Sequence, residues 1–235
     1  MKKQQLPRQN KKVIEDKEHQ RLLQLTRYER EARSQGFKAI AGIDEAGRGP
    51  LAGPVMAAAC VIPEGLYFRH INDSKQLSAE MREQIFEELI NHAEVSFAVG
   101  VICQSEIDRI NIFQATICAM LQAVAGLSLI PDYLLVDGLQ LPHPRIPSLK
   151  LIKGDAISQS IAAASVIAKV TRDRFMVEND ARWPQYGFKK HKGYGTPQHL
   201  AALAEHGPCP LHRFSFAPVK GKAEWKQEEL FSSIK

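Results

Sequence analysis

The chain has 235 residues, 44% of them hydrophobic, which is enough for one domain with a sizeable core. Its longest uncharged apolar run, residues 51–63, is too short to cross a membrane, and the polar N-terminus lacks the apolar stretch of a secretory signal. The four cysteines form no C-x-x-C pair, which fits a reducing compartment. We therefore expect a soluble, cytoplasmic protein without membrane contact, monomeric by default.

The net charge of +5 is unevenly distributed along the chain. Residues 1–37 carry a net charge of +5, residues 38–180 carry −5, and residues 181–222 carry +6. Basic segments on an acidic body favour a polyanionic partner, and nucleic acid is the commonest one.

Changes in composition divide the chain into three parts. We expect a basic N-terminal extension at 1–37, partly helical or disordered, with a weak apolar stripe through Leu22, Leu25 and Tyr28. A main domain is expected at 38–222, including a basic C-terminal part, and a short tail at 223–235.

Short apolar runs predict the strands of one sheet. They occupy residues 38–44, 55–62, 93–103, 132–138 and 149–155. Because two strands come first and later ones alternate with helices, the pattern predicts an α/β domain with a mixed sheet.

Three helices are predicted between and after these strands. Ser78 is the expected N-cap of the first, and Ser105-x-x-Asp108 resembles a capping box for the second. The third is long, begins at Asp155, and has an alanine- and serine-rich middle that permits close packing.

Acidic residues terminate three of the predicted strands. Asp44 and Glu45 end the first strand, Asp137 ends the fourth, and Asp155 follows the fifth. Each taken alone is explained as a turn or cap residue, and Asp155 as a helix N-cap. Strand ends in an α/β sheet converge on one crevice, however, where clustered carboxylates repel one another unless cations intervene.

Oxygen ligands of this kind select Mg²⁺ or Mn²⁺, and two such ions can drive phosphodiester hydrolysis. Neighbours on a regular strand point to opposite faces, so Asp44 and Glu45 share the crevice only if the strand ends or twists at Ala46-Gly47.

Other chemistries find little support. The sequence has no phosphate-binding G-x-x-x-x-G-K-[ST] loop, no G-x-S-x-G elbow and no H-E-x-x-H motif. His206-x-x-Cys209-x-x-His212 lacks a fourth zinc ligand, and we interpret it as a polar loop.

Seven collinear motifs between about residues 40 and 219 resemble the ribonuclease HII family. They are GIDEAGRGPLAGPV, NDSKQLS, NIFQATICAM, LLVDG, KGDAISQSIAAASVIAKVTRDR, HKGYGTPQH and RFSFAPV. The resemblance implies a ribonuclease H-like mixed β-sheet flanked by helices, with a C-terminal helical and basic segment. It also implies an endonuclease that needs Mg²⁺ or Mn²⁺, with two ions during catalysis.

The implied substrates are RNA–DNA hybrids and DNA duplexes containing single ribonucleotides. Cleavage would fall 5′ of the ribonucleotide and leave a 3′-hydroxyl and a 5′-phosphate. By the resemblance, the metal-binding catalytic acids are Asp44, Glu45, Asp137 and Asp155.

The resemblance also implies the substrate contacts. The Gly47-Arg48-Gly49 turn would meet the 2′-hydroxyl at the RNA–DNA junction, because glycines allow backbone groups to approach a sugar closely. Tyr194 would stack on the neighbouring deoxyribose. Phosphate or polar contacts are expected from Ser74, Lys75, Lys153, Lys169 and Arg172, although Lys169 and Arg172 also fit a solvated helix face.

Three alternatives remain open at this point: a DNA-cleaving relative, a nucleic-acid-binding protein with an inactive nuclease fold, and a small-molecule α/β enzyme.

The N-terminal extension is too short for the additional domain of ribonuclease HIII, and its charge suggests that it raises substrate affinity. A contact with a replication clamp is not established by the sequence.

Overall fold

The computed structural model describes the backbone of residues 8–220 and the side chains of residues 17–220; the predicted tail at 223–235 lies outside these ranges. A five-stranded sheet has the strand order β3-β2-β1-β4-β5. The strands are β1 (Ile40–Ala46), β2 (Val55–Val61), β3 (Ser96–Ile102), β4 (Tyr133–Asp137) and β5 (Ser148–Leu151). The first three pair antiparallel, whereas β4 pairs parallel with β1 and β5. The predicted α/β fold with a mixed sheet is confirmed.

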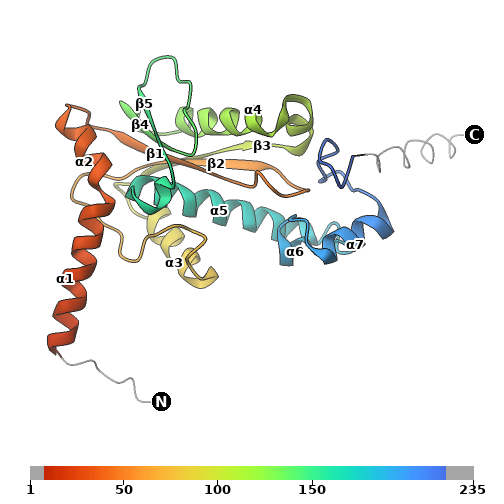
Figure 1. The fold of residues 1–235 in the computed structure, drawn as a ribbon, viewed down its shortest axis with the longest axis horizontal. Coiled ribbons are helices and arrows are strands. Elements are labelled where there is room, and N and C mark those ends of the chain that lie inside the picture. Colours follow the sequence, from red (N-terminus) through yellow and green to blue (C-terminus); the bar gives the residue numbers. More distant parts are fainter. Residues whose placement is uncertain (1–7, 221–235) are drawn as a thin grey trace, which may run out of the picture.

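Helices cover both faces of this sheet. Figure 1 shows α4 on one face, α5 and α3 on the other, and α6 and α7 beyond the C-terminal end of α5. No helix among the described residues is long and apolar enough to cross a membrane. The helical elements are α1 (Arg8–Leu25), α2 (Arg27–Ser34), α3 (Ala79–Ile90), α4 (Gln104–Ala125), the 3-10 turn η1 (Gly154–Ala156), α5 (Gln159–Asp180), α6 (Phe188–His191) and α7 (Pro197–His206).

The central strand β2 explains why both faces are covered. Its residues Ala57 and Ala59 pack in the apolar cluster that includes α4, whereas Ala58 and Cys60 pack in the cluster that includes α5. Successive side chains of a strand point to opposite faces, so an unbroken apolar run needs a helix on each side.

Helix α5 approaches β1 closely because neither element is bulky at the contact. A Cβ atom on Gly42 would lie 2.1 Å from the Ser160 carbonyl carbon, and Ala162, Ala163 and Ala164 are fully buried. Any side chain at position 42 would therefore push the start of α5 away from the strand that carries Asp44.

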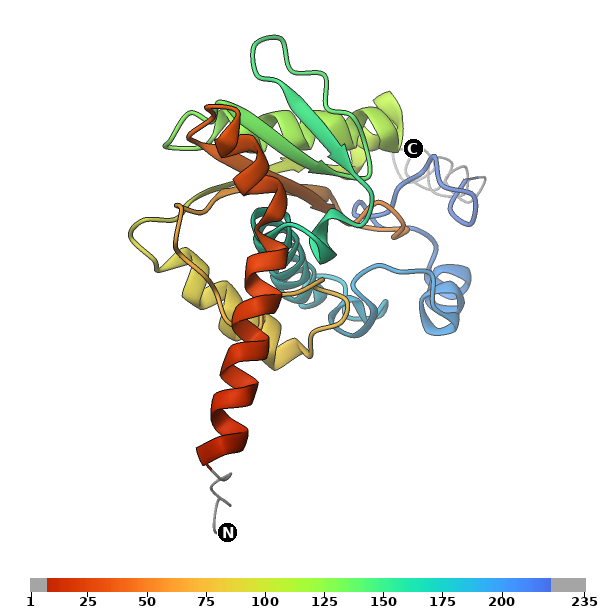
Figure 2. The same ribbon diagram turned by 60° about the vertical axis from the view of Figure 1, so that its left-hand side comes forward.

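The N-terminal helices pack against the rest of the domain. Figure 2 shows α1 and α2 passing beside the N-terminal end of α5. Leu22 and Leu25 are buried in the cluster that includes α5, and Ala32 is buried with Ile40 and Ile161. Apolar burial thus holds part of the basic extension against the domain, while the boundary at residue 37 stays a prediction.

Two of the three predicted helix starts differ in the structure. Ser78 does cap α3, since its hydroxyl accepts from the Met81 N–H at 3.2 Å. The capping box at Ser105 is wrong, because α4 begins at Gln104 and Asp108 instead accepts hydrogen bonds from the Phe214 and Ser215 N–H groups.

Asp155 is not the N-cap of the long helix. It lies in η1, and Ser158 caps α5 by accepting from the Ile161 N–H at 3.2 Å. The carboxylate of Asp155 is therefore not used as the α5 cap.

Candidate active site

Strands β1 and β4 run parallel, and an acid lies at the same end of each. Ile43 pairs with Val136, so Asp44 and Asp137 follow at the same level of the sheet. Asp44 is 5% exposed, and it lines a cavity of about 430 Å³ together with Glu45. The adjacent acids therefore do face one crevice, and the strand ends directly after them at Ala46.

The turn η1 brings Asp155 to the same place. Asp155 is 4% exposed, and its Oδ2 lies 3.9 Å from the Lys75 Nζ. The Gly154 N–H donates to the Asp137 Oδ1 at 2.6 Å, so the turn that carries Asp155 is fastened to Asp137. Acids from three separate segments of the chain thus become neighbours.

Burial and neighbouring negative charge disfavour the ionised forms of three of these acids, which are Asp44, Glu45 and Asp155. Burial raises the pKa of Asp44 well above its ordinary value, and the charges of Glu45 and Asp137 raise it further. Burial also raises the pKa of Glu45, with Arg48 acting in the opposite direction. For Asp155, burial and then the charges of Asp73 and Asp137 raise the pKa to about 6. Such a site gains from added positive charge.

One carboxylate oxygen of the cluster has no hydrogen-bond partner within the described part of the protein. The Glu45 Oε2 is buried and has no hydrogen-bond partner, while its Oε1 lies 3.1 Å from the Arg48 Nη1. In the part of the chain that the structure describes, no three acidic, histidine or cysteine side chains converge closely enough to hold a metal ion. The neighbouring acids nevertheless offer carboxylate oxygens, which are the hard donors that fit Mg²⁺ or Mn²⁺.

Two buried arginines hold the loop that follows β1. Arg213 is fully buried and donates to the carbonyl groups of Gly47, Arg48 and Gly53. Arg172 is 1% exposed and donates to the carbonyl groups of three residues, which are Ala52, Pro54 and Lys192.

Both the solvated face suggested for Arg172 and an outward phosphate contact require an exposed guanidinium. The structure overturns the solvated-face reading, because this side chain is 1% exposed and bonded to backbone on all sides. Burial lowers the pKa of Arg172 and also lowers that of Arg213, to about 9. Six charge-assisted hydrogen bonds to carbonyl groups compensate the two buried charges.

Tyr194 faces the same cavity from the C-terminal part of the chain. Its side chain is exposed at 43%, and the Cβ position of Gly49 lies 3.8 Å from the Tyr194 Cε1. The Lys169 Nζ is 5.9 Å from the ring centroid and also bonds Asp173 at 2.8 Å. The glycine turn and the tyrosine therefore lie on facing sides of one crevice.

The remaining predicted contacts differ in accessibility. Ser74 is buried, and its hydroxyl accepts from the Ser165 hydroxyl at 2.7 Å. Lys75 lines the cavity with 79% of its side chain exposed. Lys153 is exposed in a left-handed backbone conformation at the start of η1, outside the cavity lining. Ser165 also lines the cavity, and sequence reasoning missed it.

The segment interpreted as a polar loop is buried at Cys209 and His212, whereas His206 is exposed. Cys209 is 4% exposed and His212 is fully buried. The Cys209 N–H donates to His212 Nδ1 at 2.9 Å, His212 Nε2 lies 3.0 Å from His199 Nε2, and His199 Nδ1 lies 2.9 Å from the Tyr194 carbonyl oxygen. The ring nitrogens of His199 and His212 are thus used within the protein, and they support the backbone of Tyr194 rather than a zinc ion.

Acids from three segments, beside a glycine turn and exposed cations, are the residue types that a metal-dependent hydrolase of phosphodiester bonds uses. The family model described as ribonuclease HII matches residues 41–219. The chain belongs to the ribonuclease HII family, and it is a metal-dependent ribonuclease that cleaves an RNA strand internally.

Named relatives agree with this assignment. The chain is 53% identical to ribonuclease HII of Chlamydia caviae, over 89% of this chain and 98% of that one. The structure of ribonuclease H2 from Pyrococcus horikoshii OT3 superposes with a TM-score of 0.68 at 27% identity, covering 81% of this chain and 99% of that one. Ribonuclease HII in the PCNA complex from Archaeoglobus fulgidus shares the fold, with a TM-score of 0.62 at 24% identity over 76% and 95% of the two chains.

Proposed function

We propose that this ribonuclease incises DNA duplexes 5′ of single embedded ribonucleotides, as well as cleaving the RNA strand of RNA–DNA hybrids. The products would be a 3′-hydroxyl and a 5′-phosphate. The observation that carries the proposal is the cavity that unites Asp44 and Glu45 with the Gly47-Arg48-Gly49 turn and Tyr194. Hydrolysis of the phosphodiester bond and recognition of the sugar at the RNA–DNA junction would thus occur in one crevice.

Four acids are assigned to two divalent ions, Mg²⁺ or Mn²⁺. They are Asp44, Glu45, Asp137 and Asp155. A pair of bound ions supplies an activated water and stabilises the leaving oxygen. The unpartnered Oε2 of Glu45 and the raised pKa of Asp44 support this assignment, because a cation compensates both.

The chain's own residues would bind and orient the substrate. The Arg48 side chain lies 3.1 Å from the Glu45 carboxylate and is 45% exposed. In this proposal it leaves Glu45 and binds a substrate phosphate. Arg213 already occupies the carbonyl groups of Gly47 and Arg48, so we assign the 2′-hydroxyl to the N–H groups of the turn.

Tyr194 and the exposed lysines complete the proposed contacts. An exposed aromatic ring opposite the glycine turn suits stacking on the deoxyribose next to the cut. Lys75 and Lys153 are exposed and suit phosphate contacts, whereas Lys169 can make one only by sharing or leaving Asp173.

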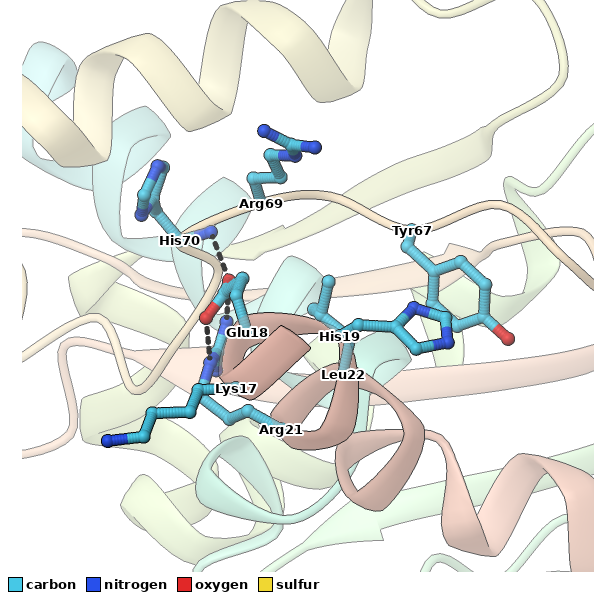
Figure 3. Close-up of a pocket in the computed structure, with 8 residues that line it drawn as sticks. All are labelled: Lys17, Glu18, His19, Arg21, Leu22, Tyr67, Arg69 and His70. Atoms are coloured by element: carbon cyan, nitrogen blue, oxygen red, sulfur yellow. Dashed lines mark hydrogen bonds and ion pairs between the residues drawn. The ribbon is translucent and has the colours of Figure 1, made fainter. Parts of the chain in front are cut away.

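The N-terminal extension is proposed to contribute phosphate contacts at a second place. Figure 3 shows a cavity, of about 620 Å³, between α1 and residues 67–70. Glu18 bonds Arg21 at 2.8 Å and the His70 N–H at 3.1 Å, while Lys17 and Arg69 are exposed.

Point substitutions test this contact better than deletion of residues 1–37, because deletion would remove Leu22 and Leu25 from the core. The double variant K17A/R69A should bind hybrid more weakly and lower the slope of log affinity against log salt by about 2. R109A, on the exposed surface of α4, is the control, and an unchanged slope in the double variant would contradict the contact.

A gel assay on a DNA duplex with one ribonucleotide tests the proposed reaction, with Mg²⁺, Mn²⁺ or chelator. Metal-dependent cleavage only at the 5′ side of the ribonucleotide is expected, and D44N should abolish cleavage while hybrid binding persists. Cleavage of long hybrids alone would remove the junction proposal. Binding without cleavage under any ion would favour an inactive nuclease fold. A cytoplasmic location and a monomeric state stay predictions.

A further inference from the structure

A buried carboxylate outside the active site reaches the helix next to Asp155. Glu29, on α2, is 2% exposed. Its Oε1 accepts hydrogen bonds from the Ser158 hydroxyl at 2.7 Å and from the Ser160 N–H at 2.9 Å. Both donors lie at the start of α5, where N–H groups lack helical partners and the helix dipole favours negative charge.

From Ser158 the contacts continue to the acids of the active site. The Ser158 N–H donates to the Gly154 carbonyl oxygen at 2.8 Å. The Gly154 N–H in turn donates to the Asp137 Oδ1 at 2.6 Å, and Asp155 is the next residue in the chain. Two residues therefore connect Glu29 with Asp137, and the same turn carries Asp155.

The burial of Glu29 at this position is energetically unfavourable. Its second oxygen, Oε2, is buried without a hydrogen-bond partner, and an incompletely compensated carboxylate costs folding free energy. Glu31 on the same helix is exposed and makes an ordinary ion pair with Arg27 at 2.6 Å. The two glutamates thus differ sharply, and only Glu29 is connected to the turn between β5 and α5.

We propose that Glu29 is a positioning residue, which fixes Asp137 and Asp155 in the arrangement that binds the metal ions. The inference rests on the proposed function, in which these acids are metal ligands. Glu29 touches neither substrate nor metal and acts through Ser158 and Gly154. Residues that orient metal ligands in this indirect way typically change metal affinity by about 10–100-fold when removed.

Mn²⁺ binding to the full-length protein, measured by calorimetry without substrate, tests this role. E29A should weaken Mn²⁺ affinity by about tenfold or more. E29Q keeps an oxygen that accepts from both donors and should stay within about threefold of the wild type. E31A is the matched control on the exposed side of α2 and should bind as the wild type does.

Kinetics provide a second readout. With E29A, kcat at low Mn²⁺ should fall and recover partly at high Mn²⁺, while KM for the hybrid stays unchanged. A merely structural role would not produce this dependence on metal concentration. If E29A does not fold, E29D decides the test, because it keeps the charge but is one methylene shorter.

The outcomes separate this inference from the proposed function. Wild-type Mn²⁺ affinity in folded E29A, or in E29D where E29A fails to fold, overturns the inference. So does a loss in E29Q as large as that in E29A, since the retained acceptor would then be irrelevant. A wild-type protein that binds no Mn²⁺ overturns the proposed metal site, and the inference with it.

Discussion

His199 and His212 meet through their Nε2 atoms at 3.0 Å, beneath the carbonyl group of Tyr194. The Cys209 N–H donates to His212 Nδ1, which places the His212 proton on Nε2 and the His199 proton on Nδ1. The Cys209 carbonyl oxygen is farther from the same Nδ1, at 3.3 Å. The chain of hydrogen bonds to Tyr194 therefore requires both imidazoles to be neutral. A second proton on either ring would place an N–H group directly against another N–H group.

This relationship predicts a loss of stability in acid. Burial, and then the neighbouring His199, lowers the pKa of His212 to about 4, and burial lowers that of His199. The stabilisation from neutral histidines is complete above the unfolded pKa of about 6.5 and is lost as the pH falls towards 4. The advantage of the wild type over H212Q should shrink by on the order of 2 kcal/mol between pH 7 and 4.5.

Thermal unfolding of both proteins across this pH range measures the difference. Groups elsewhere titrate in both proteins, so their effects cancel in the comparison. H206Q, at an exposed histidine outside the buried pair, serves as the control. A constant difference between H212Q and the wild type would show that the pair is not held neutral.

The metal-free site should itself destabilise the fold at neutral pH. Burial and neighbouring acids raise the pKa of Asp155 from 3.8 to about 6, so the stability it contributes in acid is lost as the pH rises through 6. In chelator, D155N should therefore gain stability relative to the wild type, by on the order of 2 kcal/mol between pH 4.5 and 7.5. Added Mn²⁺ should reverse the order, since only the wild type keeps the full ligand set.

Differential scanning fluorimetry with chelator and with Mn²⁺ checks both parts of this prediction. S78A, which removes the side-chain cap of α3, gives a reference loss of about 1 kcal/mol in the free energy of unfolding. Equal melting temperatures of D155N and the wild type at pH 7.5 in chelator would contradict the penalty assigned to the carboxylate.

Arg213 should matter for the junction more than for general cleavage. R213K keeps a positive charge but cannot reach the carbonyl groups of Gly47, Arg48 and Gly53 together. We therefore expect the free energy of unfolding to fall by about 2–4 kcal/mol. The freed turn should lower cleavage at single ribonucleotides more than cleavage of long hybrids. The measurement compares kcat/KM on the two substrates, with exposed R109K as control. An equal loss on both substrates would show that Arg213 only stabilises the fold.

Local patterns could predict the strands and the acids at their ends, because an apolar run that stops at Asp or Glu is visible within a few residues. The glycine turn and Ser78 were predictable for the same reason. Glu29 was not, since it is one glutamate in a charged helix and its burial depends on Ser158, 129 residues away.

The solvated helix face suggested for Arg172 was wrong, and Arg213 was missed, because arginine is usually exposed. Only the folded chain brings six carbonyl groups within reach of these two side chains. The RFSFAPV motif contained the one available signal for Arg213. Asp108 failed as a cap for a related reason, since the C-terminal segment at Phe214 and Ser215 uses its carboxylate instead.

The two glycines of the turn should respond differently to alanine. Gly47 has φ of +96°, and a Cβ there would lie 2.0 Å from the Arg172 Nε and 2.8 Å from the Pro54 carbonyl oxygen. Backbone strain and the displaced Arg172 should destabilise G47A by about 1–3 kcal/mol. At Gly49 the Cβ meets only the Tyr194 Cε1, at 3.8 Å, so G49A should fold with nearly the wild-type melting temperature.

G49A therefore separates folding from substrate approach. Its new methyl group points into the crevice between the turn and Tyr194, where the junction sugar is proposed to lie. Cleavage at a single ribonucleotide should fall about tenfold or more through KM, because a methyl group holds the sugar away from the backbone. Steady-state kinetics on the single-ribonucleotide duplex, with melting curves for both variants, provide the measurement. Wild-type KM in G49A would mean that the sugar does not approach the turn, and the 2′-hydroxyl would have to be recognised by other groups.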